Sequence, residues 1–355
     1  MLARHYYTIH HPHANLDMDR VLRVPYLVSK ELFLLCLRAV YIPFRNTIHK
    51  PALLFDLFND QWLLEKLRVR VKVEHPALAM RPLCDVYLGK IVKRGREEKV
   101  VVKALRLVGS QNSRQNRKEI RESATRKMVR ECFVWSLLKH ENICPFRGLS
   151  ELDATELPAL VSLFIPHQCM DYVRDRPEER LSVVKGAASG MRYLHDIKII
   201  HGDIKPDNIM INYEGHPQII DFGLSKFESL VGFTTQQQGQ RNTRYCAPEL
   251  LRQTVIKPTF ESDVFGFSMT VLQILDGRAV SQSIPYNHCP SDYRLWETLT
   301  EVGQVVQRPR LKQYINIPTA AHDLLQRCWE EVPESRPSMA LVCTELHSPE
   351  LTRTR

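Results

Sequence analysis

The sequence predicts an α+β protein in which a small antiparallel β-sheet with one long helix precedes a larger, mainly helical part. Three features indicate this order. Apolar residues alternate with polar ones from about residue 68 to 78, and two further extended runs follow at 85–92 and 97–107. A long helical segment then covers about 117–139. Residues 179–196 again show the periodicity of a helix.

The composition is that of an ordinary globular protein. The chain has 355 residues, of which 44% are hydrophobic and 25% charged, enough for two lobes with a sizeable core. Its nine cysteines are scattered without C-x-x-C pairs, which favours a reducing compartment and a cytoplasmic location. No apolar run approaches the length of a membrane span. The formal net charge of +9 permits nucleic acid as a partner, but the basic residues are spread out and do not favour it.

Residues 1–67 form an N-terminal extension whose role the sequence does not define. Two candidate helices lie in it, one that Ser29 would cap and one over residues 51–67 with an apolar stripe. Either helix could pack on the neighbouring domain or bind a partner, and packing is the default expectation.

The residues with the clearest chemistry lie between His201 and Gly223, in the segment HGDIKPDNIMINYEGHPQIIDFG. Asp203 precedes a lysine, Lys205, by two residues and an amide side chain, Asn208, by five. This spacing suits one loop directed at one phosphate. Carboxylate and amide oxygens are also the ligands that a hard cation such as Mg²⁺ prefers.

Short apolar runs surround these residues and predict strands. They lie at 199–200, 209–211 and 218–220, and a turn at 213–217 with Gly and Pro joins the last two into a hairpin. We therefore expect Asn208 and Asp221 to lie side by side at the open end of that hairpin.

At this point the sequence resembles the eukaryotic protein kinase family. HGDIKPDN is similar to the catalytic loop of that family, and Asp221-Phe222-Gly223 to its magnesium motif. The resemblance implies that Asp203 holds the acceptor hydroxyl and takes its proton, and that Lys205 lies near the transferred phosphate. It also implies that Asn208 and Asp221 bind Mg²⁺ and that the second substrate is ATP.

Further motifs extend the resemblance over about residues 68–346. Lys103 at the end of VVVK resembles the lysine of the third strand, and Glu131 the helix glutamate that pairs with it. Glu131 is preferred over Glu119 and Glu122 because it falls among apolar residues; otherwise it is an exposed helix carboxylate. Backbone groups of residues 163–165 would meet the adenine edge. The residues expected to bind the nucleotide are Lys103, Glu131, Val86, Val101, Ser162, Leu163, Ile165 and Met210.

The resemblance implies a bilobal kinase fold over residues 68–347. The N-lobe would cover about 68–162, the hinge about 163–166 and the C-lobe about 167–347, followed by a tail at 348–355. In the C-lobe, Asp263 resembles the aspartate that braces the catalytic loop. Arg336 resembles the arginine that pairs with the glutamate of Ala247-Pro248-Glu249. The segments NTRYCAPEL and CWEEVPESRP, which contain these motifs, look most like the tyrosine-kinase-like branch of the family, while Lys205 argues for serine and threonine acceptors.

The sequence departs from the pattern of the protein kinase family at two places. The positions of the glycine-rich loop hold Ala79, Arg81 and Cys84, with Pro82 between them, so side chains stand where backbone amides should approach phosphates. Gly202 replaces an arginine that usually clamps a phosphorylated activation loop. Activity is therefore expected not to require phosphorylation at the activation-loop positions Ser225, Ser229, Thr234 and Thr235.

The leading hypothesis is an ATP- and Mg²⁺-dependent protein serine/threonine kinase that acts on protein substrates in intracellular signalling. The first alternative is a pseudokinase that serves as a binding scaffold, which the lost glycines favour and the retained acidic residues oppose. A small-molecule phosphotransferase is a second alternative, and a nucleic-acid-binding protein is a third that rests on net charge alone.

Overall fold

The computed structural model describes residues 64–65, 67–80, 84–93, 95–106, 114–152, 155, 157–221, 242–255, 257–301 and 308–352. Both helices expected in the N-terminal extension fall outside these residues, apart from the last turn of the second. The chain divides into two compact units, whose boundary within the chain falls after Leu163. The second unit also includes Lys139–Cys144. Each unit is described by itself.

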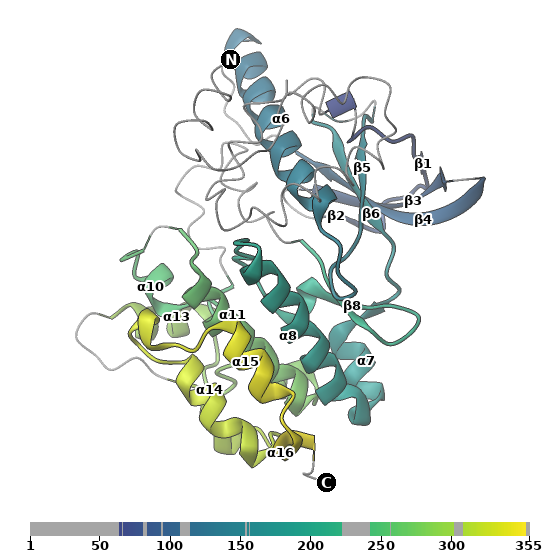
Figure 1. Ribbon diagram of the computed structural model, residues 1–355. Helices are drawn as coiled ribbons and strands as arrows, with labels where there is room; N and C mark the ends of the chain where they lie inside the picture. Colours follow the sequence, from purple (N-terminus) through teal and green to yellow (C-terminus); the bar gives the residue numbers. More distant parts are fainter. Residues whose placement is uncertain are drawn as a thin grey trace, which may run out of the picture. The chain divides into compact units, whose positions relative to one another are not determined.

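The first unit holds an antiparallel sheet with the strand order β1-β3-β4-β6-β5, and β2 also pairs with β3 (Figure 1). Its central hairpin, β3 and β4, turns at Gly95, whose φ of +75° is a left-handed conformation that glycine adopts without a steric penalty. The strands are β1 Lys72–Val73, β2 Ala79–Met80, β3 Cys84–Lys93, β4 Arg96–Leu105, β5 Phe146–Ser150 and β6 Ala159–Leu163.

The first expected strand, at about 68–78, is wrong in its extent. Only the two-residue strand β1 forms there; β2 begins directly after this range, at Ala79, and both strands pair with β3. The intervening residues 74–78 stand opposite only two residues of β3, Tyr87 and Leu88. Pro76 lies in the middle of this segment and has no N–H to donate to the ladder, so the strand is interrupted there.

The two faces of the sheet differ in kind. Val100, Val102 and Ala104 of β4 are buried and form a core with Ile91, Ala159 and Val161. The alternate residues of β4 face the other way, because successive side chains of a strand point to opposite faces. Val101 and Lys103 therefore share the second face, where their side chains are half-buried.

Helix α6, Arg114–Leu137, contacts β5 and completes the first unit (Figure 1). The Trp135 ring near its end lies against Phe146 of β5, with ring centroids 4.8 Å apart. The helix expected at about 117–139 is thereby confirmed with slightly earlier bounds.

The second unit combines a three-stranded sheet, β7-β8-β9, with most of the helices. Its strands are β7 His167–Gln168, β8 Ile209–Ile211 and β9 Pro217–Ile219. The α-helices are α7 Cys169–Asp175, α8 Arg180–Asp196, α10 Pro248–Leu251, α11 Phe260–Asp276, α12 Val280–Ser283, α13 Asp292–Thr300, α14 His322–Cys328, α15 Met339–Leu346 and α16 Pro349–Thr352. The short 3₁₀-helices are η1 Pro177–Glu179, η2 Pro206–Asn208, η4 Leu311–Gln313, η5 Thr319–Ala321 and η6 Pro333–Ser335.

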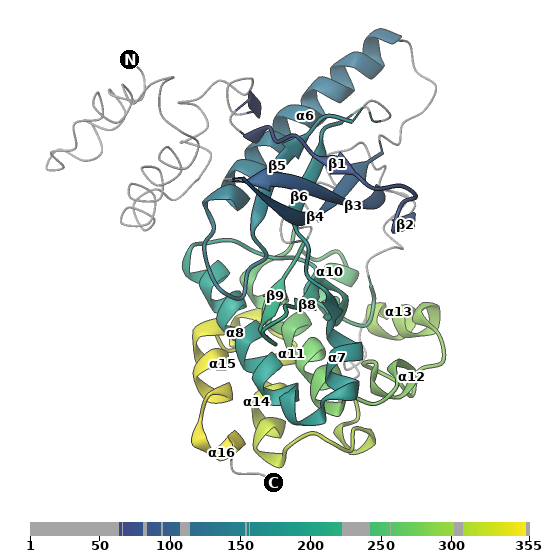
Figure 2. The ribbon, with the colours of Figure 1, turned by 90° about the vertical axis from the view of Figure 1, so that its right-hand side faces the viewer.

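Helix α11 is the centre of this unit, where it contacts α7, α8, α12 and α14 (Figure 2). Thr259 and Ser262 form a capping box at its start, and Gly277 ends it with a φ of +59°. Every residue from Ser262 to Asp276 is buried, as in a helix that is surrounded on all sides. Among the described residues, no helix is long and apolar enough to cross a membrane.

The strand expected at residues 199–200 is not formed. The N–H of Ile199 donates to the carbonyl of Leu194 at 2.8 Å. This hydrogen bond closes the C-terminal turn of α8, so the same N–H is not available to a sheet. The hairpin expected after it is confirmed as β8 and β9.

Candidate active site

Asp263 of α11 holds the loop that begins at His201. Its carboxylate oxygens accept hydrogen bonds from the backbone N–H groups of His201 and Gly202, each at 2.7 Å. The Nε2 of His195 lies 3.0 Å from the same carboxylate, which is only 2% exposed. Hydrogen bonds to a charged acceptor are stronger than neutral ones, so this carboxylate fixes the course of the loop. The predicted brace is confirmed, whereas the contribution of His195 was not predicted.

The buried ring of His201 bridges two parts of this loop. Its Nε2 donates to the carbonyl of Ile220 at 3.2 Å, and its Nδ1 accepts from the N–H of Asp203 at 3.2 Å. One nitrogen donates and the other accepts, which is the arrangement of a neutral imidazole. Burial accordingly lowers the pKa of His201, although the carboxylates of Asp263, Asp203 and Asp221 act in the opposite direction.

This histidine predicts a loss of stability in mild acid. Because folding lowers the pKa of His201 below its ordinary value of 6.5, the unfolded chain binds more protons than the folded one below that pH. The free energy of unfolding should therefore fall as the pH drops below about 6.5, by at most about 1.4 kcal/mol per pH unit for this one group. Urea unfolding at several pH values between 7.5 and 5.5 measures the effect.

The control is His201→Asn, which cannot titrate in this range and should show a shallower dependence on pH. The comparison is needed because burial also lowers the pKa of His140, which therefore acts in the same direction in both proteins. Equal pH dependence in the wild type and the variant would contradict the assignment.

The carboxylate of Asp203 is held by two neighbours on its own loop. The Nζ of Lys205 donates to its Oδ2 at 2.6 Å, and the Nδ2 of Asn208 donates to the same oxygen at 3.0 Å. Asn208 also donates to the backbone carbonyl of Asp203 at 2.7 Å. The Asp203 side chain is 38% exposed, so a ligand can reach it from solvent. The structure thus brings together three of the residues singled out in the sequence.

Asp221 lies at the open end of the β8–β9 hairpin. The N–H of Ile220 donates to the carbonyl of Asn208 at 2.9 Å, directly beyond the paired residues Ile209 and Ile219. Asp221 follows with a φ of +62°, a left-handed conformation that costs a non-glycine residue about 1 kcal/mol or more. Such strain persists where the surrounding structure enforces it, and it clusters at functional sites.

The donor atoms here fit a hard cation. Both hydrogen bonds of the Asn208 amide come from its nitrogen, and no described residue engages its Oδ1, the atom that would bind a metal. An amide oxygen and a carboxylate from adjacent strand ends match the oxygen ligands of Mg²⁺. No group of three or more His, Cys, Asp or Glu residues suited to a metal occurs among the residues described.

A small cavity of about 40 Å³ adjoins this loop and was not predicted. Its lining includes Asp203 and Gly202 of the loop, Asp263 of α11, and Tyr245 and Cys246 from the segment before α10. The sequence offered a signal for this contact, because Tyr245 and Cys246 directly precede the motif Ala247-Pro248-Glu249. Arg244 anchors the segment by donating to the carboxylate of Asp292 and to three backbone carbonyls.

The predicted pair of Glu249 and Arg336 is confirmed. Two parallel hydrogen bonds of 2.7 and 2.8 Å join the guanidinium to the carboxylate. Arg336 also donates to the carbonyls of Glu330 and Glu261 and lies over the ring of Phe265. Helix α10, which carries Glu249, is thereby tied to the residue that ends η6.

In the first unit, the strand register gathers the residues expected to bind the nucleotide. Val86 stands opposite Lys103, and Val101 opposite Ser162. Directly opposed residues share a face, so these four side chains lie together on the face away from the core. Leu163 follows at the end of β6. In the second unit, Ile165 is buried and Met210 is half-buried on β8.

Several expectations fall outside the described part of the chain. Glu131 lies on α6, but its side chain does not belong to the described part of the structure, so its pairing with Lys103 stays a prediction. The strands before and after the degenerate loop pair normally, Ala79 with Val86 and Cys84 with Leu105. Other singled-out residues that the described part omits are Arg81, Pro82, Phe222, Gly223, Ser225, Ser229, Thr234 and Thr235.

Comparison with known proteins identifies the class. The profile of the family described as protein tyrosine and serine/threonine kinase matches residues 78–346. This is more than half of the chain, which therefore belongs to the protein kinase family. Its two described units carry the family's antiparallel sheet and helical lobe.

Three relatives illustrate the similarity. The chain is 29% identical over 243 residues to the rust resistance kinase Lr10 of Triticum aestivum, matching 61% of the chain and 37% of that protein. It is 28% identical over 239 residues to serine/threonine-protein kinase 12 of Arabidopsis thaliana, with 64% and 48% matched. It is 30% identical over 221 residues to mitogen-activated protein kinase kinase kinase 12 of Rattus norvegicus, with 59% and 22% matched. The chain thus spans less than half the length of each of these relatives.

Proposed function

We propose that this kinase transfers the γ-phosphoryl group of ATP to serine and threonine hydroxyls of protein substrates, in intracellular signalling. The observation that supports it best is the Asp203 carboxylate, which is reachable from solvent and held by Lys205 and Asn208 on a loop braced from α11. The names of two of the three relatives, those from Arabidopsis and rat, agree with a protein kinase, and the Arabidopsis name specifies serine and threonine.

Asp203 is the proposed base. Its carboxylate would accept a hydrogen bond from the substrate hydroxyl and take the proton as the new bond to phosphorus forms. Lys205 lies 2.6 Å from this carboxylate and orients it; its ammonium would also stabilise negative charge on the transferred phosphoryl group. A lysine at this position is the reason for proposing serine and threonine as acceptors.

Asn208 and Asp221 are the proposed ligands of Mg²⁺, through the unengaged amide oxygen and the carboxylate at the hairpin end. Magnesium bound there would neutralise charge on the phosphate oxygens. Lys103 is the proposed phosphate contact of the first unit, and Glu131 its proposed partner. The adenine contacts proposed are Val86, Val101, Ser162, Leu163, Ile165 and Met210.

The alternatives gain no support from the structure. The site retains the residues that a scaffold would not need, and the family matched is one of protein kinases. The Glu249–Arg336 pair also ties down a segment that a small-molecule phosphotransferase does not require. The retained residues support catalysis despite the lost glycines.

The test is phosphate transfer from ATP labelled on its γ-phosphate to a generic basic protein, with phosphoamino-acid analysis of the product. Label should appear on serine and threonine, and omission of Mg²⁺ or its chelation should remove the signal. Label on tyrosine alone would contradict the proposed acceptor, and no transfer from ATP under any divalent cation would contradict the proposed activity.

A further inference from the structure

A basic hollow lies on the second unit, separate from the residues of the proposed site. It is open to solvent, has a volume of about 660 Å³, and is lined by the segment around η4 and the end of α14. Its lining includes Arg308, Arg310, Lys312, Gln313, Trp329 and Glu330. Three of them are cations and one is an anion, so the lining carries two net positive charges.

Trp329, which lines the hollow, carries an unusual buried donor. Trp329 is 2% exposed, and its indole Nε1 has no hydrogen-bond partner among the described residues. A buried N–H without a partner is costly, and most such groups in native proteins are satisfied. The amide oxygen of Gln313, another residue of the lining, is likewise buried without a partner in the described part of the chain. The indole N–H lacks an acceptor and the amide oxygen lacks a donor, so a ligand that completes both must bring an acceptor and an N–H or O–H donor, as an anionic group on a peptide does.

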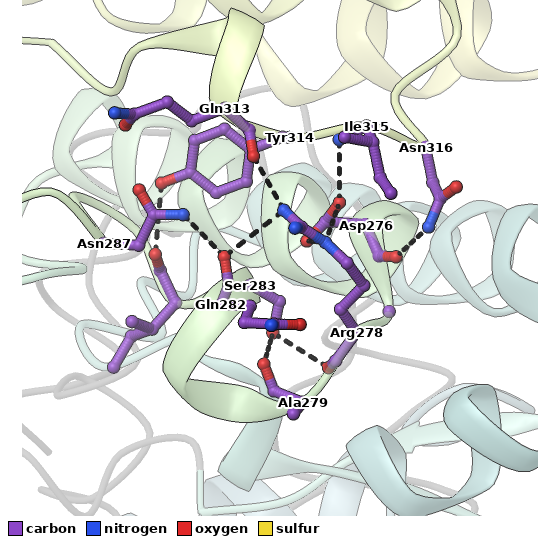
Figure 3. Close-up of polar contacts among 12 residues, drawn as sticks. Asp276, Arg278, Ala279, Gln282, Ser283, Asn287, Gln313, Tyr314, Ile315 and Asn316 are labelled. Carbon is purple, nitrogen blue, oxygen red and sulfur yellow. Dashed lines mark hydrogen bonds and ion pairs between the residues drawn. The ribbon is translucent and has the colours of Figure 1, made fainter.

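The cationic side of the hollow is held in place before any ligand binds. In η4, the N–H of Gln313 donates to the carbonyl of Arg310 at 2.8 Å, so this turn presents Arg310, Lys312 and Gln313 together. Arg278 donates to the carbonyl of Gln313 at 2.7 Å and is itself held by the buried carboxylate of Asp276. Figure 3 shows this network, with the Gln313 side chain directed away from it.

The charge and shape of the hollow favour a phosphate monoester. Such a group carries close to two negative charges at neutral pH and has three acceptor oxygens. Arginines suit it because their planar N–H donors match phosphate oxygens, and the indole N–H adds one more donor. Neither Arg310 nor Lys312 has an ion pair with any residue in the described ranges, and both are exposed at the rim. A phosphoryl group fills only a small part of the volume, and Pro309 and Leu311 add apolar surface for flanking groups.

We infer that this hollow binds a phosphorylated serine or threonine side chain of a protein partner. The phosphoryl oxygens would face Arg310, Lys312 and the indole N–H of Trp329, and the residues next to the phosphorylated one would pack on the apolar lining. This role is independent of phosphoryl transfer by the chain itself, and it would give the kinase a second point of attachment to a partner that is already phosphorylated.

The test is fluorescence anisotropy with the full chain in its Asp203→Ala form, without nucleotide, so that nothing is turned over. The probe is a labelled peptide with one phosphoserine among glycines, alanines and leucines, compared with the same peptide unphosphorylated. The phosphopeptide should bind at least about tenfold more tightly, because each charge-assisted hydrogen bond contributes about a factor of ten or more. Its affinity should fall as salt is added.

The decisive variant is R310A/K312A, which should lose about tenfold or more of this affinity. The matched control is R294A/K257A, which removes the same two charges from exposed positions outside the hollow and should bind within about twofold of the parent. Trp329→Phe, which keeps a ring but removes the N–H, should weaken binding of the phosphopeptide and leave the unphosphorylated one unchanged.

Three outcomes would overturn the inference. The first is equal affinity for the phosphorylated and unphosphorylated peptides, and the second is unchanged binding by R310A/K312A. The third is displacement of the peptide by free O-phosphoserine as strongly as by unlabelled phosphopeptide, which would assign the hollow to a small phosphate compound and not to a protein. None of these results depends on whether the chain phosphorylates serine, so failure here is distinguishable from failure of the proposed function.

Discussion

Replacing Asp203 by alanine should lower the rate of phosphoryl transfer by about 10²–10⁴-fold, the range attributed to a positioned general base. The structure supports a large effect because this carboxylate is the acceptor for both Lys205 and Asn208. Its removal takes away the proposed proton acceptor and leaves the lysine without the partner that positions it. Initial rates with saturating ATP and a basic protein substrate measure the loss.

Asp207→Ala is the matched control, because Asp207 is an exposed carboxylate on the same loop. It should retain activity within about twofold, since an exposed charge contributes little to a neighbouring site. Asp203 is itself partly exposed, so the Asp203→Ala protein should unfold at nearly the wild-type urea concentration. Residual activity above about one tenth of wild type in a folded Asp203→Ala protein would rule out the proposed base.

Replacing Arg336 by alanine should destabilise the protein by about 3–5 kcal/mol, the cost of leaving one member of a buried ion pair without the other. The side chains of Arg336 and Glu249 are only 0% and 8% exposed, so water cannot substitute for the lost partner. The variant also leaves the carbonyls of Glu330 and Glu261 without this donor. The midpoint of urea unfolding, with an unchanged slope, measures the effect.

A second variant separates the buried charge from simple loss of packing. Arg336→Met with Glu249→Leu removes both charges and keeps apolar volume, and it should recover part of the lost stability. Arg294→Ala, an exposed arginine on α13, should change the free energy of unfolding by less than about 0.5 kcal/mol. A destabilisation by Arg336→Ala as small as that of Arg294→Ala would show that the pair contributes nothing beyond a surface contact.

The local patterns of the sequence predicted the elements that depend on short-range structure. The hairpin of β8 and β9 follows from its apolar runs and a turn with Gly215 and Pro217, and α6 was expected as one long helical segment. The failures were also local. The expected strand at 68–78 contains Pro76, which has no backbone N–H. In the expected strand at 199–200, the N–H of Ile199 donates to a carbonyl at the end of α8 instead of to a neighbouring strand. In both cases a backbone N–H was not available for pairing in a sheet, and the pattern of apolar residues does not indicate which N–H groups are available.

The candidate site was predicted as a set of residue types and spacings. The sequence placed Asp203, Lys205 and Asn208 on one loop, and the motif resemblance paired Glu249 with Arg336, 87 residues away. It did not indicate that His195 would share the carboxylate of Asp263, nor that His201 would link Asp203 to Ile220. Those contacts join segments that are distant in the chain, and no spacing rule specifies them.

The sequence by itself determined the family and the set of groups that we propose to bind a proton, a phosphate and a cation, because those groups occur at fixed spacings in short motifs. Only the tertiary structure decided which of them meet. Helix α11 brings Asp263 to the loop at His201, and the cations around η4 line the same hollow as Trp329. The physical reason is that burial and strand register arise from contacts between distant segments, and these set the charge, the hydrogen-bond partners and the pKa of each side chain.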